Sequence, residues 1–264
     1  MSKKLRIGID INEVLRARWL QFDRFYDNEF GGGEDSPPAV YTYDFFGDYP
    51  WKDTVEITKD LKEPEDMPDN INPLDYQPSD ELDGEAPADL FLFKAPVKKT
   101  LTAKEVYNRF VYEDFVFEIH GSAPMMYKNM DLQVNEFYFK YKEFVDFVII
   151  SKENQFSIPS TLLFLSKIRT RFTEYKFSED NSELCKGLDC IITTDPGLIE
   201  HVNNNELCEI IKLKRPYNEH IYNGIITPVL QINDLNGNPQ FETIINYVAP
   251  TEEIDGSTQE KLNN

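Results

Sequence analysis

The feature that most constrains this chain is a set of short apolar runs, each of which ends in a polar residue. Three runs carry the clearest pattern: residues 4–10 (Lys-Leu-Arg-Ile-Gly-Ile-Asp), 146–151 (Asp-Phe-Val-Ile-Ile-Ser) and 189–194 (Asp-Cys-Ile-Ile-Thr-Thr). Runs of this length that are rich in isoleucine and valine are typical of strands buried inside a sheet. We therefore predict three buried strands, the first ending at Asp10 and the second at Ser151.

Helical periodicity fills the stretches between these strands. Apolar residues recur at helical spacing from Val14 to Phe30, and Gly31 ends that pattern. The same reasoning predicts helices at 103–118, 131–145, 158–174 and from Pro196 onward, with shorter strands at 175–178 and 208–213. Strands that alternate with helices indicate an α/β fold with a Rossmann-like, mostly parallel sheet that carries helices on both faces.

The chain beyond residue 224 has a different pattern. Two apolar runs, Leu230–Ile232 and Phe241–Tyr247, flank the dipeptide Asn236-Gly237. Asn-Gly between apolar runs favours a tight turn between antiparallel strands. The sequence therefore predicts a C-terminal β-hairpin, followed by a polar tail formed by the last fifteen residues.

Between residues 31 and 98 the composition changes. This stretch holds 9 of the 16 prolines, and its 17 acidic and 5 basic side chains account for 12 of the 20 net negative charges of the chain. It has no regular periodicity, but aromatic residues are scattered through it. One interpretation is a disordered acidic insertion. The other is an extended arm that orders on a protein partner, with its aromatic residues as anchors.

The charge and the cysteines limit the classes of function. A formal net charge of −20 argues against nucleic acid or an anionic membrane as the main partner, because phosphate groups would be repelled. No apolar run approaches the length of a membrane span, and the N-terminus leads into a strand without a signal-peptide core. Cys185, Cys190 and Cys208 lack zinc-site spacing, so we expect reduced thiols in the cytoplasm, or in a virion if the protein is viral.

Several of the predicted strands end in residues that can carry chemistry. In a parallel sheet, ligands bind at the carboxyl ends of the strands. Here those ends bear Asp10, Ser151 and the run Thr193-Thr194-Asp195. The three histidines, His120, His201 and His220, show no ligand spacing and are interpreted as structural or solvated.

The order of these residues resembles the haloacid-dehalogenase superfamily. Ile-Gly-Ile-Asp10-Ile-Asn12-Glu-Val-Leu-Arg is similar to its first motif, Ser151 to the second, Lys167 to the third and Thr-Thr-Asp195-Pro to the fourth. The run Leu-Lys-Arg-Pro-Tyr-Asn that follows the last core strand resembles the 5′-nucleotidase (deoxyribonucleotidase-like) branch. Ser151 and Lys167 also have plainer interpretations, as a helix-start hydroxyl and a surface lysine.

The resemblance implies a division of the chain into a phosphatase-like core with additions. The core would comprise residues 1–30 and 146–223, and a helical cap would comprise residues 99–145. The acidic, proline-rich extended insertion at 31–98 and the hairpin and tail at 224–264 would be added to it.

The resemblance also implies a reaction that this chain is poorly equipped to perform. In the family the first aspartate, here Asp10, attacks phosphorus, the acid two residues later exchanges a proton, and the motif acids bind Mg²⁺. Asn12 cannot exchange a proton as a carboxyl group does, and Thr193 and Thr194 replace both acids of the fourth motif. Only Asp10 and Asp195 remain as metal ligands, so we expect a vestigial site without a cofactor.

Three functions remain open at this point. The first is a catalytically degenerate structural or assembly component, in particular of a bacteriophage tail or capsid, that contacts other protein subunits through residues 31–98 and the C-terminal tail. The second is a Mg²⁺-dependent, 5′-nucleotidase-like phosphatase in which Asn12 and Asp195 suffice. The third is a metal-free protein that binds phosphate or a nucleotide at Ser151 and Lys167.

Overall fold

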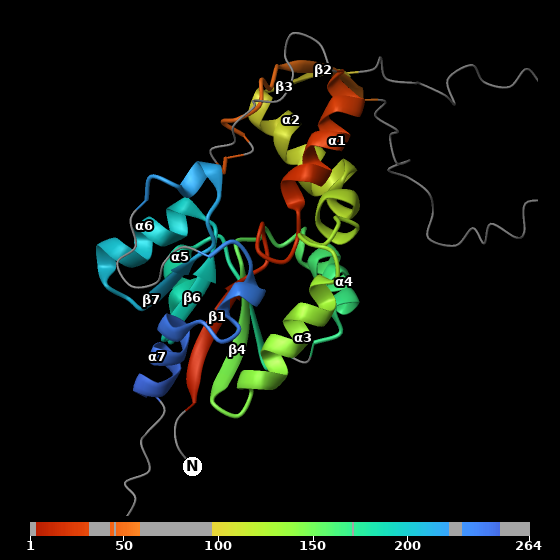
Figure 1. The fold of residues 1–264 in the computed structure, drawn as a ribbon. Coiled ribbons are helices and arrows are strands. Elements are labelled where there is room, and N and C mark those ends of the chain that lie inside the picture. The colour runs from red at the N-terminus through yellow and green to blue at the C-terminus, as the bar shows by residue number, and fades with distance from the viewer. Residues whose placement is uncertain are drawn as a thin grey trace, which may run out of the picture. The chain divides into compact units, whose positions relative to one another are not determined.

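The structure, a computed structural model, describes residues 4–31, 43–44, 46–58, 97–170, 172–221 and 229–248 (Figure 1). The chain divides into two compact units, one formed by Met1–Pro50 with Asn108–Asn264 and the other by Trp51–Tyr107. Most of the predicted acidic insertion at 31–98 and the predicted polar tail lie outside the described residues.

The larger unit is built on a five-stranded sheet, whose central strands lie side by side in Figure 1. Its strands are β1 (Leu5–Asp10), β4 (Val145–Ser151), β5 (Glu174–Phe177), β6 (Cys190–Thr193) and β7 (Glu209–Lys212). Their order is β5-β4-β1-β6-β7, and every neighbouring pair is parallel. The predicted Rossmann-like, mostly parallel α/β sheet is therefore confirmed, and the strand order reverses at β1, beside β6.

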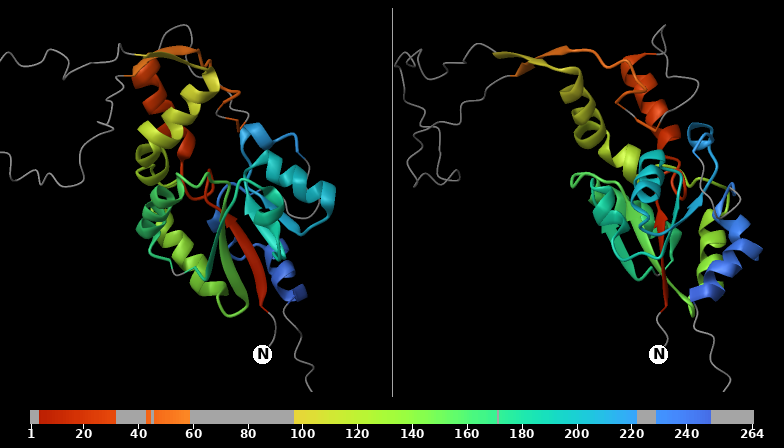
Figure 2. Two further views of the ribbon diagram at one scale, coloured as in Figure 1. Left: turned by 180° about the vertical axis from the view of Figure 1, so that it is seen from behind. Right: turned by 90° about the vertical axis from the view of Figure 1, so that its left-hand side faces the viewer.

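Helices cover both faces of this sheet. One face packs against α3 (Met130–Tyr141), α4 (Ile158–Ile168) and α7 (Pro239–Val248), whose buried residues share one core with β1. Helices α3 and α7 meet over this face (Figure 2). The ring centroids of Phe137 and Phe241, one from each helix, lie 5.4 Å apart. The other face packs against α5 (Asn181–Cys185) and α6 (Pro196–Asn205).

The first helix begins later than the periodicity predicts. Helix α1 spans Arg18–Phe30, while Val14 and Leu15 lie in a tight loop that folds back on itself. In this loop the backbone N–H of Arg16 donates to the carbonyl of Ile11 at 2.9 Å. The helix ends as predicted at Gly31, whose φ of 79° suits a residue without a side chain. The fold-back loop is what brings Arg16 to the carboxyl edge of the sheet.

The predicted helix at 103–118 is divided into three pieces. Helix α2 covers Ala103–Arg109, and two π-helical segments follow, η1 (Phe110–Asp114) and η2 (Phe117–Gly121). Segments of π-helix are rare and occur frequently at functional sites. The second segment holds His120, which is completely buried.

The prediction of a C-terminal β-hairpin is wrong. The run Phe241–Tyr247 belongs to helix α7, and a 3-10 turn, η4 (Ile232–Leu235), precedes it. The Oδ1 atom of Asn238 accepts the backbone N–H groups of Gln240 at 2.9 Å and Phe241 at 3.2 Å, which is the arrangement of a helix N-cap. Buried residues at helical spacing then fix this segment against α3. The local Asn-Gly signal is therefore overridden by the helix cap and by tertiary packing.

Replacement of Asn238 by alanine should lower the free energy of unfolding by about 1 kcal/mol, because the first turn of α7 loses its cap. Asn238→Asp is the matched control, since a carboxylate can accept the same two N–H groups and should keep the stability within about 0.5 kcal/mol of the original. Urea denaturation of both variants measures the difference. Equal losses in the two variants would contradict the assignment of the cap.

The smaller unit contains two antiparallel strands, β2 (Thr54–Thr58) and β3 (Val97–Leu101). Helix α2 begins there with a reciprocal cap, because the hydroxyl of Thr102 accepts from the N–H of Glu105 while the carboxylate of Glu105 accepts from the N–H of Thr102. The sequence does not decide whether residues 31–98 form strands. Strand β2 lies within this segment, so at least part of it is in a strand. Within the described ranges, no helix combines the length and apolar character needed to cross a bilayer.

Candidate functional site

Three of the predicted site residues meet at the carboxyl edge of the sheet. Asp10 ends β1, and its Oδ2 accepts the hydroxyl of Thr193 from β6 at 2.7 Å. Asn12 lies in the loop after β1 and donates from Nδ2 to the hydroxyl oxygen of Ser151, at the end of β4, at 3.1 Å. Asp10, Asn12 and Ser151 are all buried, with at most 3% of their surface exposed. The parallel register of the strands, which the sequence predicts, brings these residues together.

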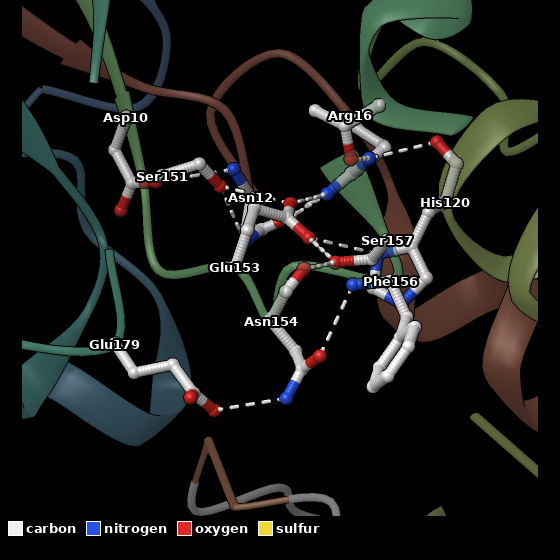
Figure 3. A network of polar contacts seen from close by, with 11 residues as sticks. Asp10, Asn12, Arg16, His120, Ser151, Glu153, Asn154, Phe156, Ser157 and Glu179 are labelled. Atoms are coloured by element: carbon white, nitrogen blue, oxygen red, sulfur yellow. Dashed lines mark hydrogen bonds and ion pairs between the residues drawn. The ribbon is translucent and has the colours of Figure 1, made fainter. Parts of the chain in front are cut away.

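A buried arginine joins this group (Figure 3). The guanidinium group of Arg16 has no exposed surface, and its Nη2 atom donates to Oδ1 of Asn12 and to Oε1 of Glu153, both at 2.5 Å. Its Nη1 atom donates to the carbonyl of His120 at 2.7 Å and to the hydroxyl of Thr161 at 2.8 Å. Arg16 thus ties the loop after β1 to α4 and to the π-helical segment η2.

The carboxylate of Glu153 lies at the centre of the network in Figure 3. Its Oε1 atom accepts from Arg16 and, at 3.0 Å, from the hydroxyl of Ser151. Its Oε2 atom accepts from the hydroxyl of Ser157 and lies 3.3 Å from Nδ1 of His120. Both oxygens therefore have two polar neighbours each, and the side chain is fully buried.

Electrostatics keep Glu153 ionised in this interior. Burial opposes the charged form, but the charge of Arg16 and the hydrogen bonds outweigh it, so the pKa of Glu153 lies well below its usual range. Burial lowers the pKa of His120 to about 4, which leaves its imidazole neutral at pH 7. The centre of the network is thus a single ion pair between Arg16 and Glu153.

Asp10 has the opposite environment. Burial, and secondly the nearby charge of Asp195, raise the pKa of Asp10 to about 7, and no basic residue is hydrogen-bonded to it among the described side chains. Asp195 serves as the N-cap of α6, where its Oδ1 atom accepts the N–H groups of Gly197 at 2.8 Å and Leu198 at 3.3 Å. Burial also raises the pKa of Asp195.

These residues fit a magnesium ion poorly. Mg²⁺ requires near-octahedral oxygen ligands, usually including carboxylates. Asp10 already accepts hydrogen bonds at both oxygens, Asp195 caps a helix, and the backbone carbonyl of Asn12 accepts from the hydroxyl of Thr194 at 3.3 Å. Within the described part of the chain, no group of three or more histidine, cysteine or acidic residues is arranged to hold a metal.

Lys167 lies apart from this site. It is near the C-terminal end of α4, and its ammonium group donates to the backbone carbonyl of Gly121 at 2.7 Å. The three cysteines are free thiols, Cys185 and Cys190 being buried and Cys208 partly buried. Burial raises the pKa of Cys208 to about 12, so this thiol is a poor nucleophile at neutral pH.

The residues at the centre of the network are not among those predicted from the sequence. Arg16 and Glu153 each stand shortly after a predicted strand end, four residues after Asn12 and two after Ser151. Arg16 follows one predicted buried strand, and Glu153, of opposite charge, follows another. Opposite charges after two predicted strands are the signal that could have suggested the pair. His120 has no such signal, since η2 brings it into place.

The site thus consists of Asp10, a buried acid without a cationic hydrogen-bond partner among the described residues, beside a closed polar network. No protein-family model matches the sequence, and a search of curated proteins finds no significant match. The interpretation of the site therefore depends on its own contacts. Those contacts satisfy both the amide of Asn12 and the hydroxyl of Ser151 within the protein.

Proposed function

We propose that this chain is a catalytically inactive protein with a haloacid-dehalogenase-like core that serves as a structural component of a larger protein assembly, in particular a bacteriophage tail or capsid. The observation that carries the inactivity is the buried ion pair of Arg16 with Glu153. This pair and its neighbours occupy the polar groups that a substrate would have to engage.

The cost of opening the network supports this proposal. A phosphoryl group that approached Asp10 and Ser151 would have to separate Ser151 from Glu153 and Asn12. Removing a hydrogen-bond partner from a buried polar group costs about 1–3 kcal/mol, and more where the group left behind is charged, as Glu153 is. The phosphate would also meet Glu153 and Asp195, whose charges repel it.

The chemistry of Asn12 also supports the absence of activity. Asn12 occupies the position at which the family resemblance implies a proton-exchanging acid, and an amide cannot replace it. General acid–base catalysis is typically worth about 10²–10⁴-fold in rate. Asn12 is also held by Ser151 and Arg16, so its amide is not available to a substrate.

An exposed apolar face on α4 and the turn before it supports the assembly role. Phe156, Leu162 and Leu163 are 62%, 46% and 44% exposed. Single exposed apolar residues are ordinary, but neighbouring ones mark surfaces that are covered by a partner. The composition of the acidic segment at 31–98, with its scattered aromatic residues, is compatible with binding to other subunits.

The alternative function, a Mg²⁺-dependent 5′-nucleotidase-like phosphatase, is favoured by one observation. Asp10 and Asp195 lie close enough for the charge of Asp195 to raise the pKa of Asp10. A divalent cation between them would remove this repulsion. The two functions make opposite predictions for turnover.

We expect the purified chain to hydrolyse neither nucleoside monophosphates nor an aryl phosphate in the presence of Mg²⁺. The measured rate should equal that of the Asp10→Asn variant. In the unmodified chain Asp10 is not usable as a nucleophile, and in the variant this carboxylate is absent. Turnover above this background that Asp10→Asn abolishes would contradict the inactivity and establish the phosphatase.

The assembly role has a separate test. In its native source the protein should sediment with a large particle, and residues 31–98 should resist protease there but be cleaved in the purified chain. A free monomer in the native source, or a purified monomer in which 31–98 already resists protease, would contradict the role.

A further inference from the structure

We propose that Arg16, Ser151, Ser157 and His120 form a binding site for a small carboxylate, and that the side chain of Glu153 is its built-in ligand. The site is distinct from Asp10, which makes no hydrogen bond to any of these residues among the described contacts. The inference rests on the proposed function, since it explains how Ser151, the residue shared with the vestigial site, is occupied by Glu153.

The geometry around the carboxylate of Glu153 is that of a binding site. Oε1 of Glu153 accepts from Nη2 of Arg16 at 2.5 Å and from the hydroxyl of Ser151 at 3.0 Å. Oε2 accepts from the hydroxyl of Ser157 and faces Nδ1 of His120 at 3.3 Å. Each oxygen thus faces two polar groups, an arrangement that is specific for a planar, two-oxygen anion.

The donors come from separate elements, and Arg16, Ser151 and Ser157 each have a supporting hydrogen bond besides the one to Glu153. Arg16 is held by Asn12, by the carbonyl of His120 and by Thr161. The backbone N–H of Ser157 is bonded to the carbonyl of Asn154 at 3.0 Å. Donors that are fixed by their own supporting contacts remain oriented when their ligand is removed.

The part of the Glu153 side chain that occupies this site has the size of a small carboxylate. Truncation of Glu153 to alanine removes one methylene and the carboxylate, which together have the same heavy atoms as acetate. The resulting cavity would be lined by a cation and three polar groups, all nearly inaccessible to solvent. A buried, unpaired guanidinium group strongly favours an anion that can enter.

Thermal unfolding of the full-length Glu153→Ala variant in sodium formate or acetate tests the inference. The melting temperature of this variant should rise with the concentration of the carboxylate, by about 3 °C or more at ten times the dissociation constant. Sodium chloride at the same concentrations controls for ionic strength. In the unmodified chain and in Glu153→Gln, formate should raise the melting temperature no more than chloride does, because the side chain at position 153 fills the site.

Two results would overturn the inference. One is a formate effect on Glu153→Ala that equals the effect on Glu153→Gln or on the unmodified chain. If Glu153→Ala does not fold in chloride, it should be refolded from urea in formate and in acetate, and recovery in either supports the site. Failure of refolding in both, while Glu153→Gln refolds, overturns it. These outcomes are independent of phosphatase turnover, which tests only the proposed function.

Discussion

Replacement of Arg16 by methionine should lower the free energy of unfolding by about 3–5 kcal/mol. The variant keeps much of the side-chain volume but removes the only cation hydrogen-bonded to Glu153 among the described residues. The carboxylate is then left charged in an environment without exposed surface. The carbonyl of His120 and the hydroxyl of Thr161 also lose a donor. Urea denaturation at pH 7 measures the loss from the shift in midpoint at constant slope.

Two companion variants make this result specific. Arg24→Met removes an arginine from the exposed side of α1, and it should change the stability by no more than about 0.5 kcal/mol. The double variant Arg16→Met with Glu153→Leu should recover most of the loss, because replacing a buried ion pair by apolar residues is often neutral or stabilising. A loss below about 1 kcal/mol in Arg16→Met would mean that the pair is not buried as described.

The sheet could be predicted from the sequence because its signals are local. Each apolar run, such as the one ending at Asp10 or the one ending at Ser151, is long enough to specify a strand without knowledge of its neighbours. Alternation with helices then implies parallel strands, and parallel strands bring their carboxyl ends together. The convergence of Asp10, Asn12 and Ser151 follows from these steps alone.

The network could not be predicted in the same way, because its members are distant in sequence. Arg16 and Glu153 are separated by 137 positions, and their contact depends on the fold-back of the loop after β1. His120 reaches the site through a π-helical segment, whose irregular spacing has no simple sequence pattern. The wrong hairpin has a related cause, since Asn-Gly is a local turn signal and the helix that replaces it is fixed by Asn238 and by packing on α3.

The two halves of the site have opposite energetics. The half around Glu153 pairs its charges and stabilises the fold, whereas the half around Asp10 holds an acid without a cationic hydrogen-bond partner among the described residues. Acids in strained or unpaired positions are tolerated where function requires them. In the proposed inactive protein, Asp10 contributes no chemistry that would offset its cost, and that cost can be measured.

Replacement of Asp10 by asparagine should therefore stabilise the protein at pH 8. Burial and the charge of Asp195 raise the pKa of Asp10 from 3.8 to about 7 in the folded state. Below pH 3.8 the acid is protonated in both states and costs nothing. As the pH rises towards 7 the folded state retains a proton that the unfolded state has lost, so stability falls by about 1.4 kcal/mol per pH unit. The full penalty, about 4 kcal/mol as an upper value, is present above pH 7.

The pH dependence of the difference between Asp10→Asn and the unmodified chain is the decisive measurement. Asparagine has no charge at any pH, so its advantage should be near zero at pH 4, grow between pH 4 and 7, and remain constant above. Asp27→Asn, an exposed position on α1, should show no such trend. Addition of Mg²⁺ separates the two functions, because a structural protein should keep the advantage of Asp10→Asn unchanged. If Mg²⁺ at pH 8 stabilises the unmodified chain but not the variant, Asp10 binds the ion, and the phosphatase becomes the better explanation of this site.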